Sequence, residues 1–93
     1  MDKTNVYKKA IRDYGEYAQL DMAIEEMAEL MQAISKFKRG KTHNVEEEVA
    51  DVEIMIEQLK IIFDSEKIEQ IKRQKIDRLE QRLKGGITYG DRR

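Results

Sequence analysis

The chain of 93 residues contains no cysteine, no proline and only five glycines. The absence of cysteine excludes disulfide bridges, thiolate metal sites and cysteine nucleophiles. Because proline is absent and glycine occurs only at positions 15, 40, 85, 86 and 90, long uninterrupted helices are expected. No apolar run approaches the roughly 20 residues that a membrane-spanning helix needs. No secretory apolar segment follows Met1, so a cytoplasmic protein is predicted.

The length of the chain limits the number of domains that it can form. We expect one domain over residues 1–93, with residues 1–4 and 87–93 as flexible tails. A chain this short buries only about 60–65% of its unfolded surface, so a partner copy would add stability. The acidic segments and the lack of an aromatic-rich basic strand argue against a nucleic acid polymer as partner.

The spacing of apolar residues predicts four helices. The first precedes Gly15 and is capped by Thr4 or Asn5, whose side chains favour that position. The second begins between residues 16 and 18 and runs to about Lys38, and Gly40 suits its C-terminal cap.

The last two helices have recognisable starts. Asn44 begins the third helix, and Glu47 three residues later predicts a capping box. The fourth helix is capped by Asp64 or Ser65 and stops at Gly85. Short connections favour antiparallel neighbours, so the fold class is all-α, a four-helix hairpin or bundle.

The second and third helices carry matching apolar stripes, spaced alternately by four and three residues. The stripes consist of Leu20, Ile24, Met27, Met31 and Ile34, and of Val45, Val49, Val52, Ile56, Leu59 and Phe63. Ala23, Leu30 and Phe37 widen the first stripe, and Met55 and Ile62 extend the second. Such spacing is typical of a helix whose apolar face is buried in a core. The duplicated pattern predicts that these two helices pack against each other as the central pair.

Acidic residues with matched spacing accompany the two stripes. Glu26 and Glu29 are three residues apart, as are Glu48 and Asp51, and such pairs project from one face of a helix. In an antiparallel pair the four carboxylates converge, which is unfavourable without a cation. Oxygen ligands suit Mg²⁺ or Mn²⁺, and the single histidine, His43, argues against zinc. The alternative interpretation is a solvated acidic surface.

Basic residues occupy the turn between the acidic clusters and one face of the fourth helix. Those at the turn are Lys36, Lys38, Arg39 and Lys41. They fit a phosphate-bearing ligand, although cations at a helix C-terminus also complement its dipole. On the fourth helix Lys75 and Arg78 share a face, and Lys75 either binds phosphate or extends its amine to solvent along an apolar stem.

The two acidic clusters resemble the signature of a known family. Glu25-Glu26-Met27-Ala28-Glu29 and, after eighteen residues, Glu48-Val49-Ala50-Asp51 resemble the EExxE and ExxD motifs of MazG-like, all-α nucleoside triphosphate pyrophosphohydrolases. The segments 33–40 and 47–52 are also similar to small members, and the resemblance spans roughly residues 19–83. It implies an all-α NTP pyrophosphatase fold, assembled as a homodimer or homotetramer. The implied reaction is Mg²⁺-dependent hydrolysis of an NTP or dNTP to the monophosphate and pyrophosphate, with Mn²⁺ as a substitute.

The resemblance also implies roles for individual residues. The metal ligands would be Glu26, Glu29, Glu48 and Asp51. Glu25 and Glu47 would support catalysis, one of them orienting or deprotonating the water that attacks the α-phosphorus. With the basic clusters added, the substrate-binding candidates are Lys36, Arg39, Lys75, Arg78 and Gln19, the last near the base. Arg82 is an alternative to Arg78.

Two other functions compete with hydrolysis. The chain could be a non-catalytic nucleotide-binding or helical protein-interaction module of the same fold, or a purely structural dimer. The complete set of four carboxylates favours an enzyme, because a binding module has less need of every one. Ser35 and Ser65 have no neighbouring base in a recognisable arrangement, so direct attack by water is expected.

Overall fold

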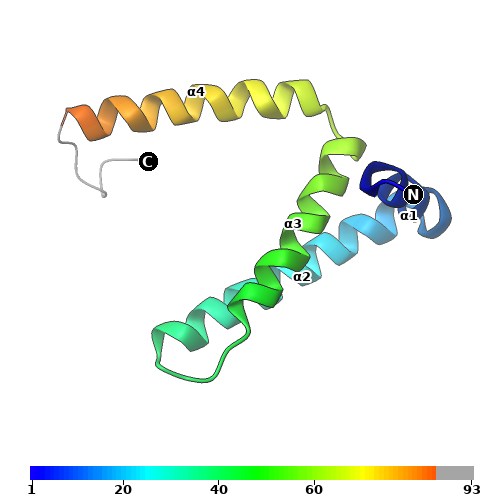
Figure 1. The fold of residues 1–93 in the computed structure, drawn as a ribbon, viewed down its shortest axis with the longest axis horizontal. Coiled ribbons are helices and arrows are strands. Elements are labelled where there is room, and N and C mark those ends of the chain that lie inside the picture. Colours follow the sequence, from blue (N-terminus) through cyan, green and yellow to red (C-terminus); the bar gives the residue numbers. More distant parts are fainter. Residues whose placement is uncertain (86–93) are drawn as a thin grey trace. The chain divides into compact units, whose positions relative to one another are not determined.

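The computed structural model describes residues 1–85, and the tail expected at residues 87–93 lies outside the described residues. Within residues 1–85 there are four α-helices and no strand (Figure 1). They are α1 (Lys3–Tyr14), α2 (Glu16–Lys38), α3 (Val45–Ile62) and α4 (Ser65–Lys84). The predicted all-α class and the number of helices are confirmed. No helix in this part of the chain combines the length and apolar character that crossing a membrane requires.

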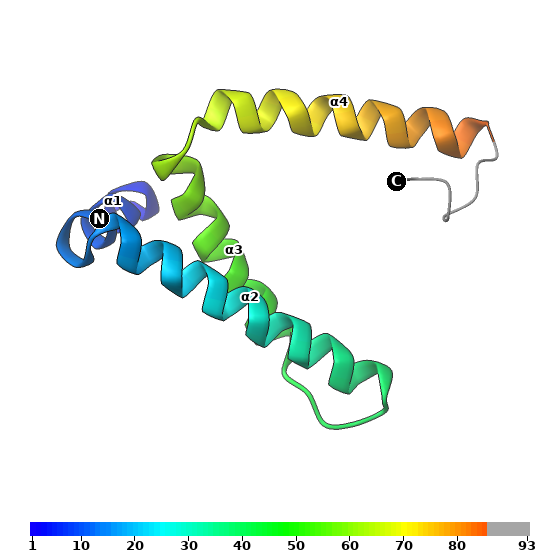
Figure 2. The same ribbon diagram turned by 180° about the vertical axis from the view of Figure 1, so that it is seen from behind.

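The chain forms two compact units, Met1–Phe63 and Asp64–Arg93. In the first unit α2 and α3 lie side by side as an antiparallel hairpin, which confirms their predicted pairing (Figures 1 and 2). The helix α1 packs against both of them at the end of the hairpin away from its turn (Figure 2). There Lys3 Nζ lies 3.4 Å from Glu57 Oε2 on α3. In the described part of the second unit, α4 is the single helix.

Local interactions at the helix ends explain the boundaries. The prediction that Thr4 or Asn5 caps α1 is wrong, because Asp2 Oδ1 accepts a hydrogen bond from the Asn5 amide at 2.9 Å. A carboxylate at this position also interacts favourably with the helix dipole, so the helix starts at Lys3. Gly15 ends α1 with a φ of 98°, which other residues rarely adopt. Asp64 caps α4 in the same way as Asp2 caps α1.

The turn of the hairpin is closed as predicted at Gly40, which has a φ of 70°. Its amide donates to the Phe37 carbonyl at 3.0 Å, and the Lys41 amide donates to the Lys36 carbonyl at 2.9 Å. These two bonds form a Schellman motif, which satisfies carbonyls that the helix end leaves free. The rings of Phe37 and His43 meet edge to face with centroids 5.2 Å apart, so both ends of the turn are tied together.

The predicted capping box at the start of α3 is not formed. Asn44 is the N-cap residue, but its side chain makes no capping hydrogen bond. Its Nδ2 instead donates to Glu48 Oε1 at 2.8 Å and to Glu47 Oε2 at 3.4 Å. The Val45 amide, the first of the helix, donates to His43 Nδ1 at 3.3 Å. The Asn44 side chain thus directs its amide nitrogen to carboxylates of the first turn and makes no hydrogen bond to the helix end.

The surface on which α2 meets α3 differs from the predicted stripes. The buried side chains are Gln19, Ala23 and Ala33 on α2, and Glu48, Met55 and Gln58 on α3. We continue the pattern of these buried residues along each helix at spacings of three and four residues. The resulting contact surface, which we call the seam, has positions 19, 23, 26, 30 and 33 on α2 and positions 48, 51, 55, 58 and 62 on α3. The apolar core among the described residues is small, consisting of Ala23, Ala33 and Met55.

The predicted burial is wrong for six of the eleven stripe residues, which are exposed, whereas Ala23 and Met55, predicted to widen the stripes, are buried. Each seam residue is followed by an apolar one, which gives positions 20, 24, 27, 31 and 34 and positions 49, 52, 56, 59 and 63. One residue turns about 100° around a helix, so these ten residues lie beside the seam. We call them the apolar flank. Ile24 is 68% exposed and Met31 is 70% exposed. The stripes and the seam have the same spacing of three and four residues. The spacing alone therefore does not show which of the two surfaces faces the neighbouring helix.

Candidate metal centre

The hairpin brings acidic side chains of α2 and α3 together. Carboxylate oxygens of Glu26, Glu29 and Glu48 lie within 4.8 Å of one another, and so do oxygens of Glu47, Glu48 and Asp51. Glu48 belongs to both groups and therefore links them. All four predicted metal ligands are members of one group or the other. The second group also includes Glu47, which was predicted to support catalysis.

The central carboxylate is buried and only half satisfied. Glu48 is 7% exposed, and its Oε1 accepts the hydrogen bond from Asn44. Its Oε2 is buried and has no hydrogen-bond partner among the described residues, and the same holds for Glu26 Oε2. Leaving a buried polar atom unpaired costs about 1–3 kcal/mol, and more for a charged group. These two oxygens are therefore placed to accept a ligand.

The electrostatics of the group disfavour its charged form. Burial raises the pKa of Glu26 above its ordinary value. The charges that raise the pKa of Glu26 further are those of Glu29, Asp51, Glu48 and Glu25. Burial also raises the pKa of Glu48, while the hydrogen bond from Asn44 acts in the opposite direction. The charges that add to the rise for Glu48 are those of Glu29, Asp51 and Glu47. Every charged group in these two sets is itself a carboxylate, so the group lacks a balancing positive charge.

The arrangement fits a hard divalent cation. In octahedral coordination at 2.0–2.1 Å, ligand oxygens on opposite sides of Mg²⁺ are about 4.2 Å apart. Adjacent ligand oxygens are about 2.9 Å apart. The oxygens of Glu26, Glu29 and Glu48 fall within 4.8 Å of one another, so side-chain movements could bring them to these separations. Carboxylate oxygens are ligands that Mg²⁺ and Mn²⁺ prefer. The residues present therefore fit the predicted ion.

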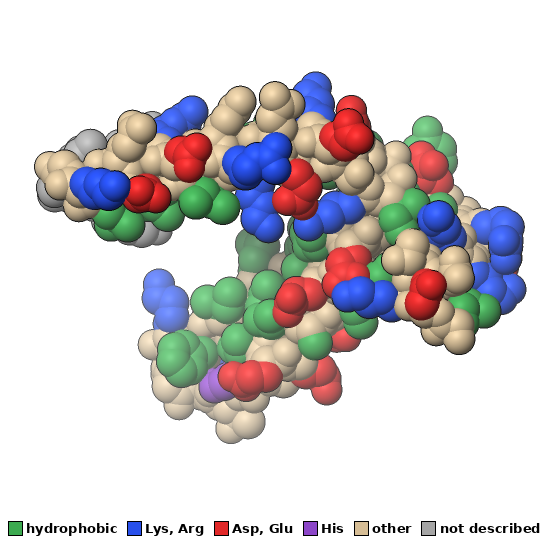
Figure 3. All heavy atoms as spheres, turned by 45° about the horizontal axis from the view of Figure 1, so that its top comes forward, with side chains coloured by type: hydrophobic (Ala, Val, Ile, Leu, Met, Phe, Trp, Pro, Cys, Tyr) green, Lys and Arg blue, Asp and Glu red, His purple; other side chains and the backbone are tan. Residues whose placement is uncertain are grey.

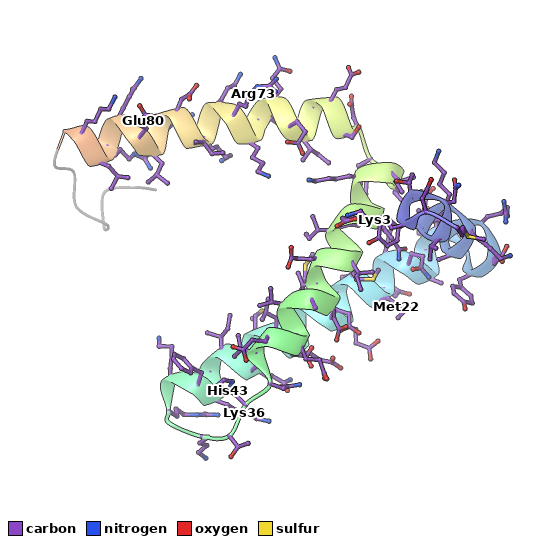
Figure 4. All side chains as sticks on the ribbon, viewed as in Figure 1. Lys3, Met22, Lys36, His43, Arg73 and Glu80 are labelled. Atoms are coloured by element: carbon purple, nitrogen blue, oxygen red, sulfur yellow. The ribbon has the colours of Figure 1, made fainter. Side chains whose placement is uncertain are left out.

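The remaining predicted residues of α2 lie around this group. Glu25 is exposed and belongs to neither group of converging carboxylates. Lys36 and Arg39 line a shallow concave surface together with Ala28, Met31, Gln32 and Ser35. Lys36 lies beside the turn that also carries His43 (Figure 4). It follows Glu29 by two helical turns, or about 10 Å along the helix axis, so it shares a side of α2 with that carboxylate.

The residues expected to bind the rest of the substrate lie farther along the chain. Gln19 is 3% exposed, and its Nε2 has no hydrogen-bond partner among residues 1–85. It precedes Glu26 by two turns of α2. Lys75 and Arg78 are exposed on α4 in the second unit, and Arg82 on the same helix is half-buried. The roles of all four in substrate binding stay predictions.

Two polar residues near the seam were not assigned to the site from the sequence. Asn44 was interpreted as a cap, whereas its side chain holds Glu48. Its spacing of four residues from Glu48 is the signal that could have shown this. Gln58 is buried with its Oε1 unpartnered. Gln58 follows Asp51 by two turns of α3, and Gln19 precedes Glu26 by two turns of the antiparallel α2. Polar residues of the seam therefore continue on both helices from the carboxylates toward the end of the hairpin away from its turn.

Comparisons with known proteins found no relative of this chain. No protein-family model matches it, and neither a curated protein nor a solved structure does.

Proposed function

We propose that the chain is an Mg²⁺-dependent nucleoside triphosphate pyrophosphohydrolase of the all-α NTP pyrophosphatase type. It would convert an NTP or dNTP to the monophosphate and pyrophosphate. The observation that carries the proposal is the buried, unpartnered Oε2 of Glu48 at the junction of two carboxylate groups. Buried charges in proteins are paired or bind metals. The resemblance of the two acidic motifs to the MazG-like enzymes supplies the reaction.

The ligands in this proposal are the four carboxylates with matched spacing. Glu26 and Glu29 from α2, and Glu48 and Asp51 from α3, would hold Mg²⁺ or Mn²⁺. When bound, such an ion lowers the pKa of a coordinated water and neutralises charge on phosphate oxygens. Asn44 fixes the orientation of Glu48 by its hydrogen bond at 2.8 Å, as groups behind metal ligands commonly do.

The remaining acidic residues would handle the attacking water. Glu47 has an oxygen within 4.8 Å of oxygens of Glu48 and Asp51, so it is the stronger candidate to orient the water and take its proton. Glu25 is the second candidate. The water oxygen forms a bond to the α-phosphorus, and the bond from that phosphorus to the oxygen of the leaving pyrophosphate breaks. Ser35 is exposed, and the sequence places no base beside it in a recognisable arrangement, in keeping with direct attack by water.

The basic residues would bind the phosphates. Lys36 and Arg39 share the concave surface on α2 and would hold the oxygens of the leaving pyrophosphate. On α4, Lys75 and either Arg78 or Arg82 would add further positive charge. Gln19 would contribute near the base. The assembly would be a homodimer or homotetramer, because a chain of this size gains stability from a partner.

One assay tests the proposal. The full chain is incubated with a panel of NTPs and dNTPs and Mg²⁺, and released pyrophosphate is measured. Glu29→Ala and Glu48→Ala are each expected to lower the rate at least about 100-fold, since even groups behind metal ligands contribute 10–100-fold. Glu53→Ala is the control, because Glu53 is exposed on α3 outside both carboxylate groups.

The possible results separate the proposed functions. Pyrophosphate release that survives both Glu29→Ala and Glu48→Ala would reject the assigned site. Absence of turnover with every nucleotide, combined with nucleotide binding, would indicate a non-catalytic binding module of the same fold.

A further inference from the structure

Two glutamines are buried in the seam, one on each helix of the hairpin. Gln19 on α2 is 3% exposed, and Gln58 on α3 is 5% exposed. Gln19 Nε2 and Gln58 Oε1 are buried without a hydrogen-bond partner among the described residues. The first of these atoms is a donor and the second is an acceptor. Each glutamine therefore lacks the kind of group that the other one offers.

The register of the hairpin places the two glutamines opposite each other. In an antiparallel pair of helices, each step back along one helix corresponds to a step forward along the other. Carboxylate oxygens of Glu29 and Glu48 lie within 4.8 Å of each other, which marks these two positions as opposite. Gln19 lies ten residues before Glu29 on α2. Gln58 lies ten residues after Glu48 on α3, so the two amides meet across the seam in the same register as the carboxylates.

The apolar residues of the seam do little to fix this register. Two of the three that are buried among the described residues are alanines, whose single methyl group packs against many neighbours. If α3 slid along α2 by one seam position, Gln19 would lie opposite Met55 or Ile62. The six residues that join the two helices are long enough to permit such a slide, which is about 5 Å. An amide buried against an apolar side chain is unfavourable, so the glutamines oppose the slide.

The carboxylates favour the slide when no cation is bound. Acidic side chains lie at several points on the surface of the hairpin (Figure 3). The charges of Glu29 and Asp51 raise the pKa values of both Glu26 and Glu48, which shows that the group repels itself. A slide of one turn would move the carboxylates of α2 away from those of α3. The register in which they meet therefore requires an interaction that the slide would break.

We propose that Gln19 and Gln58 form a hydrogen-bonded bridge across the seam, directly or through one buried water, and that this bridge holds α2 and α3 in the register in which the carboxylates meet. A rotation of the side chains would let Nε2 donate to Oε1, and a water that accepts from the one and donates to the other would serve equally. The two glutamines act through the carboxylates, so they are positioning residues. Buried polar residues that fix the register of packed helices at a cost in stability are known from coiled coils.

The bridge has a consequence for the proposed function, which it deepens. Mg²⁺ binds only the register in which the carboxylates converge, so its apparent affinity falls with the fraction of molecules in that register. The bridge keeps this fraction high before the ion arrives. The expected effect on Mg²⁺ rests on the proposed function, whereas the effect on the register does not require a metal.

The register is measured first in the metal-free chain. The chain has no cysteine, so Asp21→Cys and Glu46→Cys provide two exposed sites for nitroxide labels, one on each helix. These sites are offset along the hairpin by ten residues, or about 15 Å, and a slide of one turn changes the offset by about 5 Å. Pulsed electron paramagnetic resonance is expected to give one distance with both glutamines present. With Gln19→Met and Gln58→Met together, a second distance is expected, and excess Mg²⁺ should restore the first.

Calorimetric titration with Mg²⁺ gives the second measurement. In the double methionine variant the affinity for Mg²⁺ is expected to fall at least about tenfold. The Tm without Mg²⁺ should not fall, because removing both polar groups leaves neither unpaired. Each single variant keeps one buried amide without its partner and should lower the Tm by about 4–8 °C. A merely structural contribution would lower the Tm and the affinity together. Gln70→Met with Gln74→Met is the matched control, since both residues are exposed on α4, and it should change neither quantity.

The outcomes separate this proposal from the proposed function. One unchanged distance in the double methionine variant, or an affinity for Mg²⁺ equal to that of the wild type, would overturn the bridge. If Gln19 only contacts the base, Gln19→Met would weaken nucleotide binding and leave the register unchanged, which would also overturn it. A wild type that binds no Mg²⁺ would reject the proposed function, and the distances alone would then decide on the bridge. A crystal structure of the wild type distinguishes a direct hydrogen bond from a bridging water.

Discussion

The seam of the hairpin and the apolar flank beside it are made of neighbouring residues with the same spacing, yet their chemistry is opposite. The seam buries Glu48, Gln19 and Gln58, whereas the flank leaves residues such as Ile24 and Met31 exposed. A single chain would be more stable with these two surfaces exchanged. Under the proposed function, a cation at the seam and a partner copy of the chain would supply the stability that this arrangement lacks.

The largest expected effect concerns the one large apolar side chain that is buried in the seam among the described residues. Met55 is 4% exposed, and Met55→Ala is expected to lower the free energy of unfolding by about 2–5 kcal/mol, because it leaves a cavity. Ile54→Ala is the control, because Ile54 is 43% exposed on α3, and it should change the free energy of unfolding by less than about 0.5 kcal/mol. Urea unfolding followed by circular dichroism measures both. Equal effects would mean that the seam is not the core of the hairpin.

The next prediction concerns the cation. Mg²⁺ at about 100 times its dissociation constant should stabilise the folded chain by about 2.7 kcal/mol, which raises the Tm by about 10 °C or more. In Glu26→Gln this gain should be largely lost. Without Mg²⁺ the variant should be more stable than the wild type, because repulsion among the carboxylates falls. Thermal unfolding with and without Mg²⁺ measures the gain, with Glu53→Gln as control. An unchanged gain in Glu26→Gln would contradict the assignment of this ligand.

A smaller effect on Mg²⁺ binding is expected at Asn44, whose side chain donates a hydrogen bond to the proposed ligand Glu48. Asn44→Ala removes the hydrogen bond to Glu48 Oε1 and should weaken Mg²⁺ binding about tenfold, the lower end for such groups. The midpoint of an Mg²⁺ titration of thermal stability provides the measurement. His43→Ala is the control, because it removes the bond from the Val45 amide to the histidine ring and leaves Glu48 untouched. If both variants weaken binding equally, the turn as a whole, and not the Asn44 amide, orients the site.

The smallest expected effect is a dependence of stability on pH in the absence of metal. The pKa values of Glu26 and Glu48 are raised above the ordinary value of 4.5 in the folded chain. At a pH between the ordinary and the raised pKa, the folded state therefore binds more protons than the unfolded state. Stability should therefore fall as the pH rises from 4.5 through the raised values. Denaturation in EDTA across this window measures the fall. A double variant, Glu26→Gln with Glu48→Gln, should show a flatter profile, and stability that rises with pH would refute the assignment.

Much of the fold followed from short-range patterns. The four helices, the antiparallel hairpin and the turn at Gly40 were predictable because caps, spacing and short connections determine them. The approach of Glu26 and Glu29 to Glu48 followed from the three-residue spacing and the hairpin together. The three-residue spacing and the turn of the hairpin can each be recognised within a few residues of the sequence.

Other features depend on which of several neighbouring groups forms an interaction, and sequence patterns do not decide this. Asp2 caps α1 in place of Thr4 or Asn5, since several adjacent residues can cap and only one does. The Asn44 side chain binds Glu48 and not the helix end. The centre of the predicted face was one position away from the seam, because apolar spacing alone does not show which edge of a wide apolar face meets the neighbouring helix.

The offset of one residue between the seam and the apolar flank makes the hairpin sensitive to small insertions. One residue inserted between Ile24 and Glu25 would rotate the first part of α2 by about 100° relative to the rest. Leu20 and Ile24 would then occupy the seam positions of Gln19 and Ala23, while the residues from Glu25 onward kept theirs. The insertion of a single codon could thus convert this part of the hairpin into one that buries its own apolar residues.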